Sequence, residues 1–252
     1  MSISKRYFLK LSYKGTHYHG WQIQENSFTV QEALENALSI YFRKPMSIMG
    51  SGRTDTGVHA SMQVCHFDFD LDIDRNKFLR AINGILPKDI SIHTIQEVKP
   101  DAHARFSAKE RAYIYRIILQ KNPFLEEFAW LSYFQPDIAK MNLASAYLLK
   151  YSDFECFSKV HTDVKHFRCE IKTAFWEQKG EELLFHITAN RFLRGMVRAI
   201  VGTLVDVGLG KKTPDEMDHI ITSKNRNHAG KSAPAKGLFL SRIEYSEDIY
   251  LD

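Results

Sequence analysis

The sequence of 252 residues contains only three cysteines, and no two of them form a CxxC pair. This scarcity excludes a disulfide framework and a zinc ribbon, and it favours a reducing cytoplasm. No apolar run approaches the length of a membrane span, and the basic N-terminal segment passes directly into alternating polar and apolar residues rather than a signal peptide. We therefore expect a cytoplasmic protein that is not bound to a membrane.

Motifs for nucleotide and metal cofactors are also missing. The GKS triplet at residues 230–232 resembles the end of a P-loop, but Asn225 stands where the first glycine belongs and no strand precedes it. A metal site would have to come from three residues at an unfamiliar spacing, namely His161, His166 and Cys169. We expect neither a metal nor another cofactor.

The composition indicates a folded core and an unevenly basic surface. Of the residues, 44% are hydrophobic and 25% are charged, with a formal net charge of +4. Lys and Arg outnumber Asp and Glu by 7 to 4 in residues 5–60, by 6 to 2 in residues 99–121 and by 10 to 5 in residues 190–245. With eleven tyrosines, this pattern suits a cleft that binds a polyanion. A generally basic surface without that role is the alternative interpretation.

Apolar periodicity predicts a first α+β half over residues 1–106. Residues 6–13 alternate as in a half-buried strand, and residues 29–42 repeat at three and four as in a helix that begins with a capping box. Further elements expected in this half are strands near 46–50, 62–69 and 90–97 and a short helix at 74–84.

The same order of elements restarts at residue 109 and predicts a second half over residues 107–252. Its expected elements are a strand from 109, a helix at 137–150, strands at 168–178 and 183–189, a helix at 191–207 and a last strand at 238–245. The fold class is therefore α+β, with two similar halves. Each half should consist of an antiparallel sheet with helices on one face, and together they should form a central basic cleft.

The most unusual segment is GRTDTGVHA at residues 52–60, which places Arg53 two residues before Asp55 in a loop bounded by glycines. Glycines let the backbone approach a ligand, and a neighbouring guanidinium favours the ionised form of a carboxylate. Those conditions suit a nucleophilic or basic aspartate. An aspartate that merely caps a turn is the alternative, because Asp is common in turns.

A stripe of arginines is expected on the helix at 191–207. Arg191, Arg194 and Arg198 are spaced by three and four, so they would lie on one helical face. Such a stripe can bind phosphates or a buried carboxylate. For Arg191 and Arg194 a solvated charged face is the alternative, whereas Arg198 stands beside apolar positions and is the better candidate for a partnered role.

Six segments together resemble the tRNA pseudouridine synthase A (TruA) family, and they occur in the family's order. They are LSYKGTHYHGWQIQ, VQEALENAL, GRTDTGVHA, HARFSAKERAYIYRI, NRFLRGMVRAIVGTL and APAKGLFL. The resemblance implies an isomerase that converts uridine to pseudouridine at positions 38 to 40 of the tRNA anticodon stem-loop. It also implies a homodimer without a cofactor.

The resemblance further implies roles for individual residues. The family's catalytic aspartate matches Asp55, and the arginine before it matches Arg53. The arginine that pairs with the catalytic carboxylate matches Arg198, and the tyrosine that stacks on the target base matches Tyr113. Arg191 and Arg194 are expected to contact the substrate because of their spacing and not because of the resemblance, since the family commonly has a small residue at the position of Arg191.

The implied reaction is redox-neutral, because the N1 glycosidic bond breaks and C5 of the same uracil bonds to the same sugar carbon. It requires an ionised carboxylate, an aromatic face for the everted base and cations for the distorted backbone. Whether Asp55 attacks C6 of the uracil or C1′ of the sugar stays open. Two other hypotheses also stay open: a protein that binds and refolds or protects tRNA, with Asp55 only shaping a loop, and the same enzyme acting on other uridines or RNAs.

Overall fold

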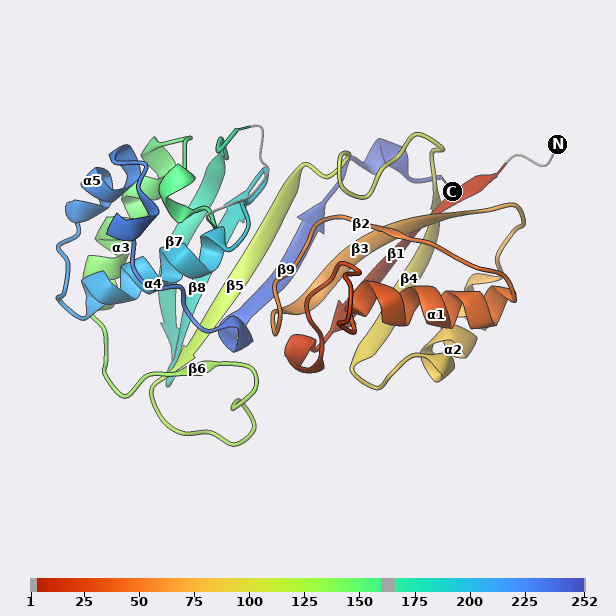
Figure 1. Ribbon diagram of the computed structural model, residues 1–252, viewed down its shortest axis with the longest axis horizontal. Helices are drawn as coiled ribbons and strands as arrows, with labels where there is room; N and C mark the ends of the chain where they lie inside the picture. Colours follow the sequence, from red (N-terminus) through yellow and green to blue (C-terminus); the bar gives the residue numbers. More distant parts are fainter. Residues whose placement is uncertain (1–3, 160–165, 252) are drawn as a thin grey trace. The chain divides into compact units, whose positions relative to one another are not determined.

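The computed structural model describes residues 4–159 and 166–251, which divide into two compact units (Figure 1). The first unit comprises the described residues up to Lys109 together with those from Leu240 onward, and the second comprises Glu110–Phe239. The sequence-based division assigned everything after residue 106 to the second half. The structure differs because the last strand and the residues after it pack with the first unit. No helix in the described residues has the length and apolarity needed to cross a membrane.

The sheet of the first unit is built around β1 (Lys5–Tyr13), which pairs antiparallel with β3 (His59–Phe69) and with β4 (Ile90–Val98). The short β2 (Met49–Gly50) pairs with β3, and β9 (Leu238–Glu244) lies on the other side of β3. The expected strands are thus present, with ends shifted by a few residues.

The two helices of the first unit begin where their caps predict. Before α1 (Val30–Phe42), the Thr29 hydroxyl accepts a hydrogen bond from the Glu32 amide at 3.3 Å. Before α2 (Arg75–Ile85), the Asp74 carboxylate accepts from the Lys77 amide at 3.0 Å. Each helix buries residues spaced by three and four, because that spacing defines one helical face.

The two faces of this sheet are covered by different parts of the chain. On one face Phe42 of α1 packs between Phe67 of β3 and Phe78 of α2, with ring centroids 5.7 and 6.0 Å apart. On the opposite face Phe8 of β1 contacts the rings of Tyr245 and Tyr250, at 5.1 and 6.5 Å. Successive strand residues point to opposite faces, so both helices lie on one side and the returning chain end covers the other.

The sheet of the second unit has the order β5-β8-β7, from β5 (Glu110–Ile118), β8 (Glu182–Ala189) and β7 (Ile171–Lys179). These neighbours are antiparallel, but β6 (Trp130–Leu131) pairs parallel with β5. The prediction of a purely antiparallel sheet is therefore wrong for this unit. The connection after β5 turns back on itself, so that β6 lies beside the last two residues of β5 and runs in the same direction.

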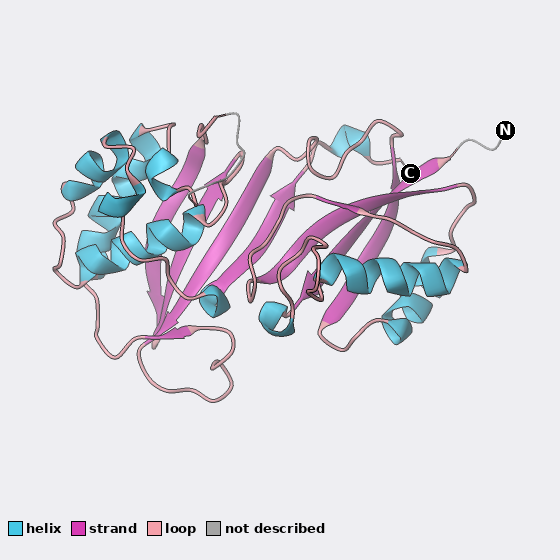
Figure 2. Cartoon of the chain, viewed as in Figure 1, coloured by secondary structure: helices cyan, strands magenta, loops and turns pink. Residues whose placement is uncertain are grey.

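The helices of the second unit are α3 (Ile138–Tyr147), α4 (Met196–Gly208) and α5 (Glu216–Thr222), as Figure 2 shows with the sheet strands. Helix α3 is fixed on β7 by the Asn142 side chain. Its carbonyl oxygen accepts from the Trp176 amide at 2.7 Å, and its amide group donates to the Trp176 carbonyl at 3.1 Å.

Helix α4 begins five residues later than its periodicity predicts. Gly195 is the N-cap residue, with φ of 71° in the left-handed region that glycine tolerates best, and the helix starts at Met196. Arg191 and Arg194 therefore precede the helix and only Arg198 lies in it. The prediction of three arginines on one helical face is wrong, because the spacing rule holds only for residues with helical backbone angles.

The segment after residue 230 crosses α4 in direct backbone contact. A Cβ atom at Gly202 would lie 1.8 Å from the Lys231 carbonyl oxygen. Nearby, the Ala233 amide donates a hydrogen bond to the Arg198 carbonyl at 2.9 Å. The absence of a side chain at Gly202 thus allows the crossing that also positions the backbone beside Arg198.

We expect Gly202→Ala to lower the free energy of unfolding by about 1–3 kcal/mol, because a methyl group would overlap backbone that cannot move easily. In an ordinary helix the same change is stabilising by about 0.5–1 kcal/mol. Gly84 in α2 provides the matched control, since a Cβ atom there meets nothing within 4 Å. Urea denaturation should show opposite signs for the two variants, and stabilisation by both would contradict the tight crossing at α4.

Candidate active site

The loop that carries Asp55 connects β2 to β3 and turns tightly around this residue. The Asp55 carbonyl accepts a hydrogen bond from the Val58 amide at 3.1 Å, which closes the turn. On the preceding side, the Thr54 carbonyl accepts from the Trp21 amide at 3.2 Å, and the Thr54 hydroxyl pairs with the Tyr13 hydroxyl at 2.8 Å. The backbone is therefore held on both sides of the carboxylate.

Two glycines of the segment 11–24 let this support approach closely. A Cβ atom at Gly20 would lie 2.4 Å from the Thr54 carbonyl oxygen, and one at Gly15 would lie 2.0 Å from that of Val58. Side chains at these positions would push the loop away. The segment thus acts as a scaffold for the Asp55 loop, a function that its sequence pattern did not reveal.

Two buried polar side chains complete the support. The imidazole of His59 accepts the Gly15 amide at Nδ1, at 3.0 Å, so that nitrogen carries no proton. The amide of Gln63 donates to the Gly52 carbonyl at 3.2 Å and its oxygen accepts from the Val64 amide at 3.1 Å. Sequence reasoning missed both as positioning residues, because Gly15 lies 44 positions before His59 and Gly52 lies 11 positions before Gln63, across the Asp55 loop.

The two residues of the first unit that were expected to be catalytic differ in exposure. Asp55 is half-buried, whereas Arg53 is exposed. A carboxylate that solvent reaches, on a loop anchored at both ends, can meet a substrate with little loss of conformational freedom.

The other candidates belong to the second unit. Tyr113 is half-buried on β5, opposite Ile187 of β8, and its ring meets Phe192 edge to face at 5.1 Å. Arg198 is half-buried in α4, and its Nε donates to the Ala233 carbonyl at 2.7 Å. Both contacts restrain the orientation of a planar group, as recognition of a flat base or a carboxylate requires.

The side chains of the two arginines that precede α4 are less restrained by contacts within the second unit than that of Arg198. A guanidinium nitrogen of Arg191 lies 3.4 Å from Nε2 of His166. Arg194 is exposed, and its carbonyl accepts from the Lys159 amide at 3.0 Å. These side chains can contact phosphates from the loop before the helix, but they do not form a stripe with Arg198.

The weak metal candidate receives no support. His161 lies outside the described residues, and the residues that the structure describes contain no cluster of three possible ligands. Burial raises the pKa of the Cys169 thiol to about 11, which keeps it protonated at neutral pH. Since the thiolate is the form that binds metals, Cys169 is a packing residue.

Comparison with known proteins supports the expected family. The family described as tRNA pseudouridine synthase matches residues 11–107 and 144–246. Among solved structures, a partial Cas6-RT-Cas1–Cas2 complex aligns over 98% of this chain and 47% of its own, with 11% identity and a TM-score of 0.24. A score that low supports no structural or functional argument.

Curated relatives match almost the whole chain. A protein of Bacteroides fragilis named tRNA pseudouridine synthase A is 50% identical over 98% of both chains. Proteins of the same name from Bacteroides thetaiotaomicron and Parabacteroides distasonis are 48% and 46% identical over 98% of this chain, which is 93% and 98% of their own lengths. With this identity and coverage, and with the GRTD loop intact, the chain belongs to the tRNA pseudouridine synthase A (TruA) family.

Proposed function

We propose that this protein isomerises uridine to pseudouridine at positions 38 to 40 of the tRNA anticodon stem-loop, in the cytoplasm and without a cofactor. The observation that carries the proposal is Asp55, a solvent-reached carboxylate on a loop whose backbone is anchored on both sides. The names of the relatives supply the reaction and the class of substrate.

Asp55 acts as the nucleophile in this proposal. Its carboxylate adds to the target uridine, the bond between N1 and C1′ breaks, and the detached uracil turns so that C5 bonds to C1′. The carboxylate is then released, C5 loses its proton and N1 gains one, so the product is an isomer of the substrate. Arg53 and Arg198 stabilise negative charge that develops on the pyrimidine.

Binding of the substrate rests on stacking and on positive charge. A base in a stem must leave its stack before Asp55 can react with it. Tyr113 offers an aromatic face to the everted uracil, with its ring fixed by Phe192. The basic segments, including Arg191 and Arg194, hold the phosphates of the distorted strand. We propose that these groups and Asp55 act on the same nucleotide.

A homodimer forms part of the proposal. The connection around β6 exposes three aromatic side chains, Phe124 at 87%, Tyr133 at 84% and Phe134 at 71% of their area. Glu126 and Glu127 stand in the same connection, where Lys236 pairs with Glu126 at 2.8 Å and Lys121 lies nearby in the sequence. The connection therefore has no excess of positive charge that would attract a phosphate backbone. A second copy of the chain would cover this apolar surface, which monomers rarely leave open.

The first test replaces the nucleophile. Asp55→Asn should retain tRNA binding and lose pseudouridine formation by on the order of 10⁴-fold or more, as removal of a nucleophile does in other enzymes. Mapping of pseudouridine in tRNA measures both the loss of activity and the position that is modified. The tRNA is taken from reactions in vitro and from cells that lack the protein. Asp70→Asn is the control, because Asp70 is exposed just beyond β3. Product formed by Asp55→Asn at the normal rate would refute the role of Asp55 as the nucleophile.

The second test separates the ring of Tyr113 from its hydroxyl. Tyr113→Ala should lose about 1–3 kcal/mol of transition-state stabilisation, measured from kcat/KM, because a stacked base loses its aromatic partner. Tyr113→Phe keeps the ring face and the contact with Phe192, so its loss should be clearly smaller. Thermal unfolding of both variants checks that the fold is intact. Equal losses would assign the role to the hydroxyl instead.

The third test concerns the association of two chains. The double substitution Phe124→Ser and Tyr133→Ser should convert a dimer to a monomer in sedimentation velocity experiments at micromolar concentration. Leu143→Ser removes a side chain of similar exposure, at 62%, from α3 and should leave the dimer intact. A parent protein that sediments as a monomer, or a double variant that stays dimeric, would refute this interface.

A further inference from the structure

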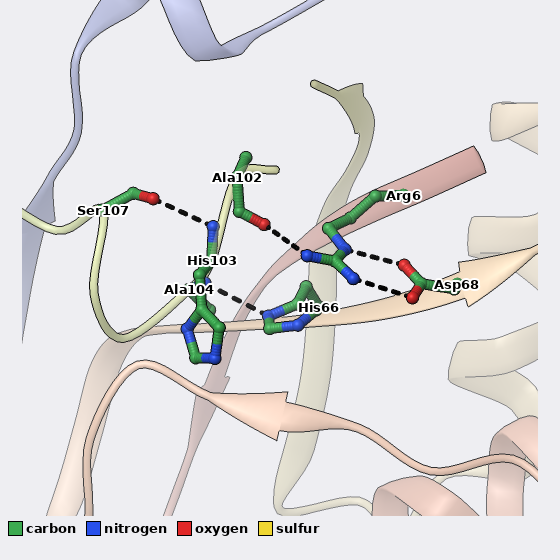
Figure 3. Close-up of polar contacts among 7 residues, drawn as sticks. All are labelled: Arg6, His66, Asp68, Ala102, His103, Ala104 and Ser107. Carbon is green, nitrogen blue, oxygen red and sulfur yellow. Dashed lines mark hydrogen bonds and ion pairs between the residues drawn. The ribbon is translucent and has the colours of Figure 1, made fainter. Parts of the chain in front are cut away.

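A polar network in the first unit fixes a turn that the proposed reaction does not use. Arg6 of β1 forms two hydrogen bonds to the Asp68 carboxylate of β3, at 2.7 and 2.8 Å, and donates a third to the Ala102 carbonyl at 3.0 Å. Figure 3 shows the guanidinium between the strand carboxylate and the chain that enters the turn. The paired strands thus hold the beginning of residues 103–107, which we name the 103–107 turn.

Two histidines continue the network as acceptors. Nδ1 of His66 accepts the Ala104 amide at 3.1 Å, and Nδ1 of His103 accepts the amides of Arg105 and Phe106 at 3.1 and 3.4 Å. Burial, helped by the charge of Arg6, lowers the pKa of His66 to about 4, and burial also lowers the pKa of His103. Both rings are therefore neutral near pH 7, as an accepting Nδ1 requires.

The turn closes on itself through Ser107. The His103 amide donates to the Ser107 hydroxyl at 2.9 Å, and the Ser107 amide donates to the His103 carbonyl at the same distance. Every backbone amide from residue 103 to residue 107 therefore has an acceptor. A turn with all its amides engaged is rigid, so the direction of the side chains on it is defined.

The side chain that this rigid turn presents outward is apolar. Phe106 exposes 76% of its area, rests on the ring of His103 at 4.5 Å and lies 5.5 Å from the Arg105 guanidinium. Burial in the core cannot explain it, because most of the ring is in solvent. A fixed and exposed ring beside a guanidinium is the arrangement that stacks on nucleobases.

We propose that Phe106, with Arg105, is a stacking platform for an unpaired nucleotide of the tRNA other than the uridine being modified. The proposal rests on the proposed function, since it assumes a tRNA substrate. The charge of the adjoining chain favours RNA over protein, because residues 99–109 of the same unit carry three Lys and Arg against one Asp. Unpaired bases in loops are the parts of RNA that aromatic side chains recognise.

The experiment measures the Kd for tRNA by fluorescence anisotropy, with Asp55→Asn as the parent so that the RNA stays unmodified. Adding Phe106→Ala should weaken binding roughly 5- to 150-fold, the range for loss of one stacked base. Adding Phe106→Trp should keep the affinity, and the emission of the new tryptophan should be quenched by tRNA. Leu71→Ala is the control in the same unit, because Leu71 is 66% exposed and should not affect binding.

A double-mutant cycle tests whether His103 acts by positioning Phe106. His103→Ala alone should weaken tRNA binding, but it should add almost nothing to Phe106→Ala, because the ring that it orients is already gone. A general loss of stability would instead weaken binding equally in both backgrounds. Thermal unfolding of each variant monitors the fold independently.

The possible outcomes distinguish a failure of the stacking platform from a failure of the proposed enzymatic function. If the Asp55→Asn parent binds tRNA and Phe106→Ala binds it equally well, the platform is refuted and the proposed function stands. If the parent does not bind tRNA at all, the proposed function fails, and the platform fails with it. Additive effects of His103→Ala and Phe106→Ala would overturn the positioning role of His103.

Discussion

The close approach of the backbone at Gly15 and Gly20 to the loop around Asp55 is the constraint on which the proposed activity depends. Side-chain atoms at either glycine would overlap the carbonyl groups of Val58 or Thr54. Because neither glycine has a side chain, the Trp21 amide and the Tyr13 hydroxyl come close enough to the loop to form hydrogen bonds with Thr54. A carboxylate on a loop held this firmly can act as a nucleophile without first being ordered by its substrate.

The two units position their functional groups by different physical means. In the first, backbone hydrogen bonds and glycine contacts hold a loop, which suits one carboxylate that must be presented precisely. In the second, Tyr113 lies on a strand and Arg198 on a helix, and the inward-facing residues of both elements are buried. The placement of the two side chains therefore follows from the packing of whole elements. The chain crossing at Gly202 combines both means. A glycine contact there lets the backbone pass close to α4, and this places the Ala233 carbonyl as an acceptor beside the Arg198 guanidinium.

Exposed aromatic residues of this protein differ in their electrostatic surroundings, and this difference separates their proposed partners. Phe106 stands on a rigid turn within a basic segment, where an RNA base can stack without repulsion of its phosphates. Phe124 is also exposed, but its connection contains Glu126, paired with Lys236, and Glu127, so it offers phosphates no excess of positive charge and favours contact with a protein. Apolar area alone does not identify a ligand, whereas the neighbouring charge does.

The sequence by itself determined the strands other than β6, the capped helices α1 and α2, the α+β class and the GRTD loop, because caps, periodicity and short motifs depend on residues a few positions apart. It misplaced the start of α4, since Gly195 adopts a left-handed conformation that periodicity does not report. Only the tertiary structure decided the parallel pairing of β6, the return of the last strand to the first unit and the supporting roles of Gln63 and His66. Most of these features depend on contacts between residues distant in the chain, and local patterns carry no information about which distant segments will meet.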